Sequence, residues 1–202
     1  MTTIQIIKTT LLAFVALFGM QTIKAAERFV NFNQGDLLLN PQKQVTITTD
    51  EADFKAVDIA VHALAADFGR VTGQDAVLQH QADAKIIVGT IGHSKFIDQL
   101  AKKKLIDATQ LKGKREKFII TTVGKQLIIA GSDRRGTVYG IYELSAQMGV
   151  SPWYYWADVP TERHEEIYVN QGIYTDGEPA VAYRGIFLND EAPCLSTWIK
   201  NT

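Results

Sequence analysis

The sequence has 202 residues, of which 46% are hydrophobic and 21% are charged, and this balance excludes an intrinsically disordered chain. The net charge is −1 and no block of Lys or Arg lines one face, so we expect neither nucleic acid nor an anionic membrane surface as a partner. The single cysteine, Cys194, excludes an intrachain disulfide.

The first 26 residues differ in character from the remainder. Lys8 precedes an apolar stretch over residues 11–20, and the small residues Ala25 and Ala26 follow. A basic start, a short apolar run and small residues at the end are typical of a secretory signal peptide. The apolar run is about half the ~20 residues that a transmembrane helix needs. We therefore expect export to the periplasm or the extracellular space, with no membrane association after cleavage.

Strand and helix patterns alternate over about residues 27–150. Strands are predicted at residues 28–32, 45–48, 76–78, 85–88, 117–123, 126–130 and 167–169, and helices at residues 53–69, 94–104 and 137–148. The strand at 85–88 is nearly all apolar, which favours a central position in a sheet. Gly124-Lys125 indicates a hairpin turn. This order predicts a small α/β sandwich with a core of its own.

The ends of the first predicted helix carry signals that fix its limits. Asp50 or Asp53 can cap its start, because a side-chain oxygen there accepts a hydrogen bond from the first turn. Gly69 and Gly73 suit its end, where glycine adopts the left-handed conformation at no steric cost.

Two features of the sequence could indicate a ligand site, one for a phosphate and one for a metal ion. Residues 89–94, Gly-Thr-Ile-Gly-His-Ser, follow an apolar strand and open a helix, where a phosphate could bind backbone N–H groups. They lack the Lys of a P-loop and the spacing of a dinucleotide fingerprint, which favours a plain turn. The four histidines stand far apart in the sequence and no cysteine cluster accompanies them, so no metal site is expected.

The run Ser-Pro-Trp-Tyr-Tyr-Trp-Ala-Asp-Val-Pro, residues 151–160, is rich in aromatic side chains. On an extended chain these side chains alternate between two sides, so one pair could pack inward and the other could face a cleft. Two interpretations stay open: an aromatic contact between domains, or stacking of at least one ring on a sugar, with Trp156 as the candidate.

The final segment predicts the start of a second domain. Residues 182–188 form an apolar, β-prone run with Arg184 near its start, and Asn189, Asp190 and Glu191 follow its end. A buried strand with polar and acidic residues at its carboxyl end is typical of a (β/α)8 barrel, which keeps its catalytic groups there. A buried Arg184 would need an anionic partner, either a neighbouring carboxylate or an acidic substrate.

We accordingly divide the chain into a signal peptide (1–26), an α/β domain with an aromatic connector (27–175) and the start of a truncated barrel (176–202). Such barrels take about 250 residues, so only the first strand is expected here. A glycosidase needs two carboxyl groups on either side of the scissile bond, and adjacent acids cannot supply both. The main catalytic acids are therefore unknown and expected beyond Thr202.

Three runs of residues resemble glycoside hydrolase family 115: SDRRGTVYGIYELS at 132–145, GVSPWYYWADVP at 149–160 and YRGIFLNDEAP at 183–193. The resemblance covers about residues 28–195. It implies an α-glucuronidase that releases glucuronic acid or its 4-O-methyl ether from xylan by inverting hydrolysis, without metal or other cofactor. It also implies that the first domain is the accessory α/β domain that precedes the barrel in hexosaminidases and other α-glucuronidases.

From this resemblance we carry over a substrate-binding role for Arg184, Asn189, Asp190 and Glu191, with Trp156 as a wall of the pocket. The partner is then a polysaccharide or oligosaccharide, and a homo-oligomer is one alternative for the longer protein. The 202 residues alone are expected to be inactive. The alternative function is a non-catalytic carbohydrate-binding or interaction module, supported by the aromatic run and the self-sufficient first domain.

Overall fold

A computed structural model describes residues 28–187, apart from the side chains of Tyr155 and Trp156. The strands are β1 (Val30–Asn31), β2 (Leu37–Leu38), β3 (Thr46–Thr48), β4 (Val77–Gln79), β5 (Ile86–Thr90), β6 (Phe118–Val123), β7 (Gln126–Gly131), β8 (Tyr168–Val169) and β9 (Ile173–Tyr174). The helices are α2 (Lys55–Thr72), α3 (Lys95–Lys102), α4 (Arg134–Gln147) and α5 (Tyr154–Ala157), with short 3-10 turns at Pro41–Lys43 and Ala108–Gln110.

A mixed six-stranded sheet in the order β4-β3-β5-β7-β6-β9 forms the centre of the described chain. Strands β4, β3, β5 and β7 are parallel, whereas β6 runs antiparallel to both β7 and β9. A second, antiparallel sheet has the order β1-β8-β2. The predicted α/β class is confirmed, and so are the interior position of β5 and the β6–β7 hairpin.

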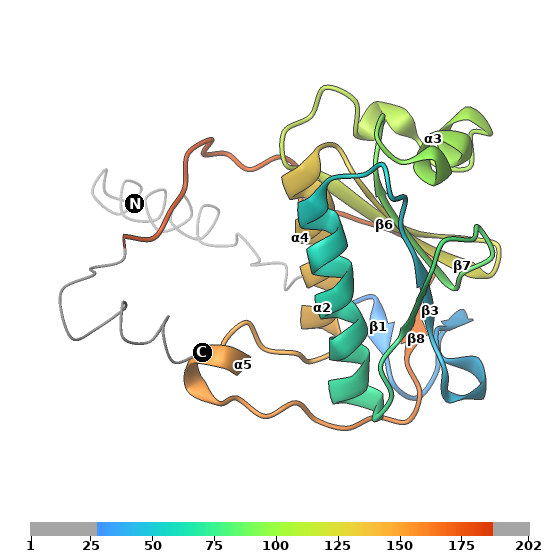
Figure 1. Cartoon of the computed structure of the whole chain (residues 1–202), viewed down its shortest axis with the longest axis vertical. Coiled ribbons are helices and arrows are strands. Elements are labelled where there is room, and N and C mark those ends of the chain that lie inside the picture. Colours follow the sequence, from blue (N-terminus) through green and yellow to red (C-terminus); the bar gives the residue numbers. More distant parts are fainter. Residues whose placement is uncertain (1–27, 188–202) are drawn as a thin grey trace, which may run out of the picture.

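Helices cover both faces of the large sheet. Figure 1 shows α2 and α4 side by side, and their apolar faces share one core with the sheet, including Leu64, Phe68 and Ile129. Helix α3 packs on the opposite face over a second cluster that includes Ile97 and Ile128. All five residues of β5 are buried, because helices cover this strand on both faces of the sheet.

Helix α2 is longer than the prediction and is capped differently. It continues through Gly69 to Thr72 and ends at Gly73, whose φ of 89° lies in the left-handed region. Neither predicted aspartate caps its first turn, since Phe54 occupies the N-cap position without a side-chain hydrogen bond. Asp53 instead accepts from the N–H of Thr90. The predicted N-cap was therefore wrong, because these carboxylates hold neighbouring loops, whereas the predicted glycine end at Gly73 is confirmed.

Helix α4 begins at Arg134, three residues before its predicted start. The carboxylate of Asp133 accepts the N–H of Gly136 at 2.8 Å, which satisfies a free donor of the first turn and extends the helix to Asp133. Asp133 is thus the N-cap, and the residues around it become important for the site described below.

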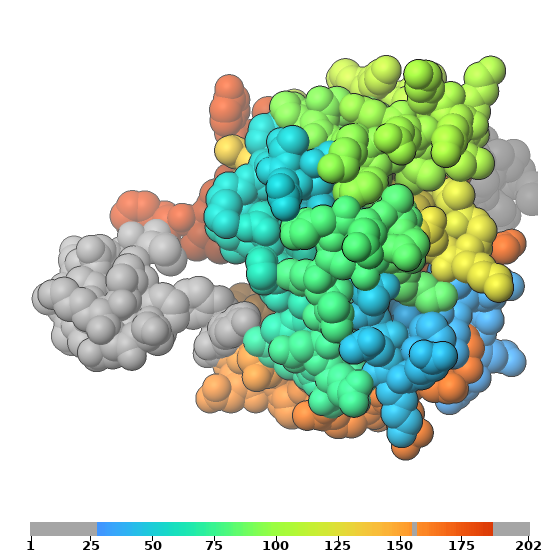
Figure 2. Space-filling model, turned by 45° about the vertical axis from the view of Figure 1, so that its right-hand side comes forward, coloured from blue at the N-terminus to red at the C-terminus, as the bar shows by residue number. Residues whose placement is uncertain are grey.

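The strand predicted at 182–188 does not form within its described part, residues 182–187. Tyr183, Ile186 and Phe187 are 95%, 88% and 91% exposed, so the prediction of a buried strand was wrong there. A strand requires a hydrogen-bonded neighbour, and no described strand pairs with these residues. In Figure 2 this red segment lies at one side of the molecule.

The predicted signal peptide lies outside the described residues. Across residues 28–187, no helix combines the length and the apolar character needed to cross a bilayer.

Candidate functional site

The predicted site residues are only partly described. Asn189, Asp190 and Glu191 lie outside the described residues. Trp156 belongs to α5, but its side chain is not described. Arg184 lies among the described residues, so the site is built from this residue.

Residues 178–181 lie along the loop that precedes β6. The backbone N–H of Arg115 donates to Glu178 at 2.9 Å, and the Arg115 guanidinium donates to the carbonyl of Pro179 at 2.5 Å. Lys114 pairs with the other oxygen of Glu178 at 3.3 Å. The hydrogen bond from the Arg115 N–H is the main cause that lowers the pKa of Glu178 below its ordinary value. Desolvation opposes it, and the hydrogen bond and charge of Lys114 add to the lowering. Residues 178–179, which precede Arg184, are therefore already held against the α/β unit.

The guanidinium of Arg184 enters a socket formed by Glu116, Arg135 and Tyr139, which we call the Arg184 socket. Its Nη2 donates to Glu116 and to the Tyr139 hydroxyl at 3.4 Å, and its Nη1 donates to the carbonyl of Val181 at 2.5 Å. Glu116 is only 5% exposed and forms a second ion pair with Arg135 at 2.8 Å. The hydrogen bond that Arg184 donates to Glu116 raises the pKa of Arg184, whose guanidinium is protonated at neutral pH in any case.

Glu116 is held in place by the start of α4. Its backbone N–H donates to Oδ2 of Asp133 at 2.8 Å, while Oδ1 of the same residue caps α4. Glu116 has a φ of 52°, a left-handed conformation that a non-glycine residue keeps only when its surroundings impose it. A side chain at Gly136 would come within 2.3 Å of the carbonyl oxygen of Lys117, so glycine allows the two segments to meet. The Ser-Asp-Arg-Arg-Gly run thus builds the socket.

The chemistry of the socket is that of an anchor. Two arginines neutralise one buried carboxylate, so neither partner is left as an unpaired buried charge. Of the two alternatives for the partner of Arg184, the described structure contains the neighbouring carboxylate, Glu116. Contact of Arg184 with a substrate stays a prediction. Sequence reasoning missed Glu116, whereas Asp133, Arg135 and Tyr139 lay in a run that it had noted without giving them a role.

The candidate phosphate position at the start of α3 is occupied by side chains of the chain itself. Oδ2 of Asp50 accepts the N–H of Lys95 at 2.7 Å, and Oδ1 of Asp98 accepts the N–H of Gly92 at 2.7 Å. Burial tends to raise the pKa of Asp50, but the hydrogen bonds from Lys95 and Ala52 bring it below the ordinary value. A carboxylate thus stands where an anion would bind, which favours the plain turn.

Neither a metal cluster nor an extended aromatic strand is found among the described residues. No group of three or more His, Cys, Asp or Glu side chains in residues 28–187 could hold a metal ion. The run predicted to be extended forms the helical turn α5, and this part of the prediction was wrong. Trp153 is 62% exposed, and the ring of Tyr154 lies 4.7 Å from the guanidinium carbon of Arg70.

Comparison with family models gives two matches that together span most of the described chain. Residues 36–144 match the glycosyl hydrolase family 67 N-terminus, and residues 176–202 match glycosyl hydrolase family 115. The chain belongs to glycosyl hydrolase family 115, with a domain of the family 67 N-terminal type. Within this family member, the Arg184 socket joins the two matched regions, since Glu116 and Arg135 lie in the first and Arg184 lies in the second.

A solved structure from family 115 gives the same relationship. A family 115 4-O-methyl-α-glucuronidase with specificity for decorated arabinogalactans superimposes with a TM-score of 0.73 and 37% identity, and the match covers 83% of this chain and 22% of that one. The chain thus spans about a fifth of that enzyme. A β-hexosaminidase from Streptomyces plicatus matches with a TM-score of 0.49 and 12% identity, covering 78% of this chain and 26% of that one. No curated protein sequence matches.

Proposed function

We propose that this chain is part of an exported glycoside hydrolase that releases α-linked glucuronic acid, or its 4-O-methyl ether, from a polysaccharide. The observation that carries the proposal is the 37% identity to a 4-O-methyl-α-glucuronidase, because the match covers 83% of the chain. The matches to families 67 and 115 support the same enzyme class.

The α/β unit has a supporting part in this proposal. It fixes the family 115 segment through the contacts of Glu178, Pro179 and Arg184 described above. Because substrate groups must be positioned within a fraction of an ångström, an anchor on a rigid unit favours catalysis by the domain that this segment begins. Asn189, Asp190 and Glu191, which follow the anchor in sequence, are the side chains that we propose contact the glucuronic acid.

The proposal also specifies the polysaccharide that is cleaved. We propose glucuronoxylan, in which single glucuronic acid units branch from a neutral xylose backbone. The similar solved enzyme is named for decorated arabinogalactans, so both polymers are compared in the test. Export is supported by the signal-like pattern of residues 1–26, and cell fractionation with detection of the cleaved N-terminus tests it.

The activity test uses the 202-residue chain and the longer protein obtained by reading its gene beyond codon 202. Release of glucuronic acid is measured from glucuronoxylan and from a decorated arabinogalactan. We expect none from the 202 residues alone and release from xylan by the longer protein. Release by the 202 residues contradicts the expected inactivity, and no release from either polymer by the longer protein contradicts the glucuronidase proposal.

A further inference from the structure

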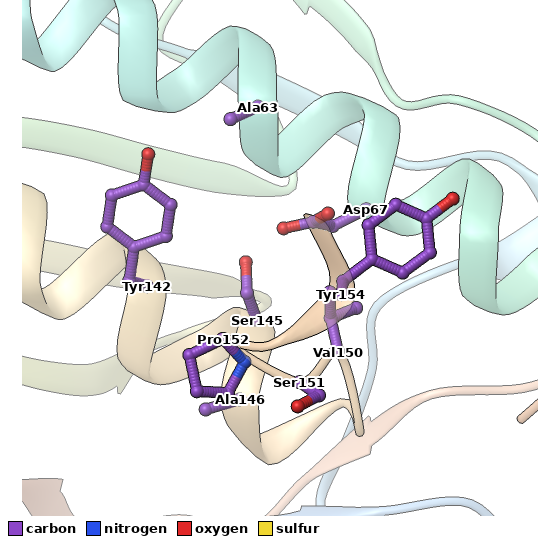
Figure 3. A pocket seen from close by; sticks show the side chains of 9 residues that line it. All are labelled: Ala63, Asp67, Tyr142, Ser145, Ala146, Val150, Ser151, Pro152 and Tyr154. Carbon is purple, nitrogen blue, oxygen red and sulfur yellow. The ribbon is translucent and has the colours of Figure 1, made fainter. Parts of the chain in front are cut away.

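A cavity of about 360 Å³ opens between α2, α4 and the turn that leads into α5, on the side of the helices away from the sheet. Figure 3 shows its lining, with Ala63 and Asp67 from α2, Tyr142 and Ser145 from α4, and Tyr154 from α5. The volume falls within the range of about 300–1,000 Å³ that small-molecule sites occupy. No contact of the Arg184 socket reaches it, so it is a separate feature of the chain.

The hydroxyl of Ser145 gives this cavity an unsatisfied polar group. Ser145 is 3% exposed, and its Oγ has no hydrogen-bond partner among the described residues. Figure 3 shows this oxygen directed into the space between Tyr142 and Asp67. Buried hydroxyls in proteins are nearly always hydrogen-bonded, because an unpaired one loses its interaction with water and gains nothing in return. A ligand hydroxyl in the cavity would satisfy it.

Asp67 supplies a second polar group on the facing helix. It is 6% exposed, and one carboxylate oxygen accepts from Arg70 at 2.5 Å. A carboxylate has about four acceptor positions, so this ion pair leaves capacity for ligand hydroxyls. Figure 3 shows the carboxylate facing the cavity above Ser145. The cavity is therefore lined by a carboxylate that accepts hydrogen bonds, from Asp67 of α2, and by a hydroxyl that can donate or accept one, from Ser145 of α4.

We infer that this cavity binds a neutral pyranose unit of a polysaccharide backbone. The walls from Tyr142, Tyr154 and Ala63 offer aromatic and aliphatic surface for the C–H faces of a sugar ring. The hydroxyls of the ring can satisfy Ser145 and Asp67. An acidic sugar fits less well, because its carboxylate would lie near that of Asp67, and Arg70, the cation that pairs with Asp67, is already neutralised by that pair. The choice of polysaccharide rests on the proposed function, whereas the cavity and its chemistry do not.

The test is calorimetric titration of the 202-residue chain with xylohexaose, galactotriose and glucuronic acid. We expect binding of at least one neutral sugar, and weaker or no binding of glucuronic acid. Ser145→Ala is expected to weaken that binding about tenfold, the loss of one well-placed hydrogen bond. The same variant should melt at a higher temperature, because it removes an unsatisfied buried hydroxyl.

Ser94→Ala is the matched control. Ser94 is fully buried and its Oγ also lacks a partner among the described residues, but it lies at the start of α3 on the other face of the sheet. We expect it to leave the dissociation constant unchanged. The inference is overturned if neither neutral sugar binds, if both variants weaken binding equally, or if glucuronic acid binds as tightly as the neutral sugars. Failure here is distinct from failure of the glucuronidase proposal, because hydrolysis is measured on the longer protein.

Discussion

Replacing Glu116 by Gln tests whether the Arg184 socket stabilises the chain. The variant keeps the side-chain shape but removes the charge that accepts from Arg135 and Arg184. A hydrogen bond to a charged group contributes about 1.5–3 kcal/mol and a neutral one about 1 kcal/mol. The arginine side chains are 50% and 36% exposed, so water compensates part of the loss. We therefore expect the free energy of unfolding to fall by about 2 kcal/mol, or the melting temperature by about 4–8 °C.

Urea denaturation followed by circular dichroism measures this change. The control is Glu178→Gln, since Glu178 pairs with Lys114 at 3.3 Å and both side chains are well exposed, at 39% and 44%. Exposed pairs contribute at most about 1 kcal/mol. Trypsin gives a second readout: freeing the Arg184 guanidinium should accelerate cleavage after that residue only in Glu116→Gln. Equal destabilisation by the two variants, or unchanged cleavage after Arg184, would refute a stabilising socket.

Three further predictions follow from the structure. Gly136→Ala should destabilise the chain by about 1–3 kcal/mol in urea denaturation, because its Cβ would meet the Lys117 carbonyl oxygen at 2.3 Å; unchanged stability would contradict this close approach. The lowered pKa of Asp50 means that its stabilisation is present above the unfolded value of about 3.8 and is lost as pH falls through the folded value, so Asp50→Asn should flatten the acid limb of the stability profile. Deleting residues 177–202 should raise soluble yield, because Ile186 and Phe187 are 88% and 91% exposed, and a lower yield would count against the domain boundary.

The parts of the fold with strong local patterns could be predicted from the sequence. The apolar run of β5 gave its central position, and Gly124-Lys125 gave the turn between β6 and β7. Strands β2 and β9, each two residues long, were missed. They form because of their partners, as in the pairing of Thr121 with Ile173, and two residues carry no periodic pattern.

Only one of the two partners in the central ion pair of the site could be predicted from the sequence. Arg184 was identified as a residue that needs an anion, but its partner Glu116 stands 68 residues earlier in a loop without any pattern. The signal that could have found it is the Asp133-to-Gly136 run, whose cap and close approach indicate a segment held against the start of α4. That run indicates that some segment packs against the start of α4, but it does not say which residue. The left-handed φ of 52° at Glu116 depends on tertiary contacts, so no local sequence pattern marks this residue.

The position of the anchor in the sheet connects the fold to the proposed function. In open α/β sheets, ligands bind at the carboxyl ends of the parallel strands. Here Asp50 and Asp53 follow β3 at that edge and accept the N–H groups of Lys95 and Thr90. Asp133 follows β7 at the same edge and holds the Arg184 socket. The chain's own carboxylates thus occupy positions that a ligand would take. An edge already filled with internal ion pairs and hydrogen bonds is stiff, which suits a unit that fixes the family 115 segment.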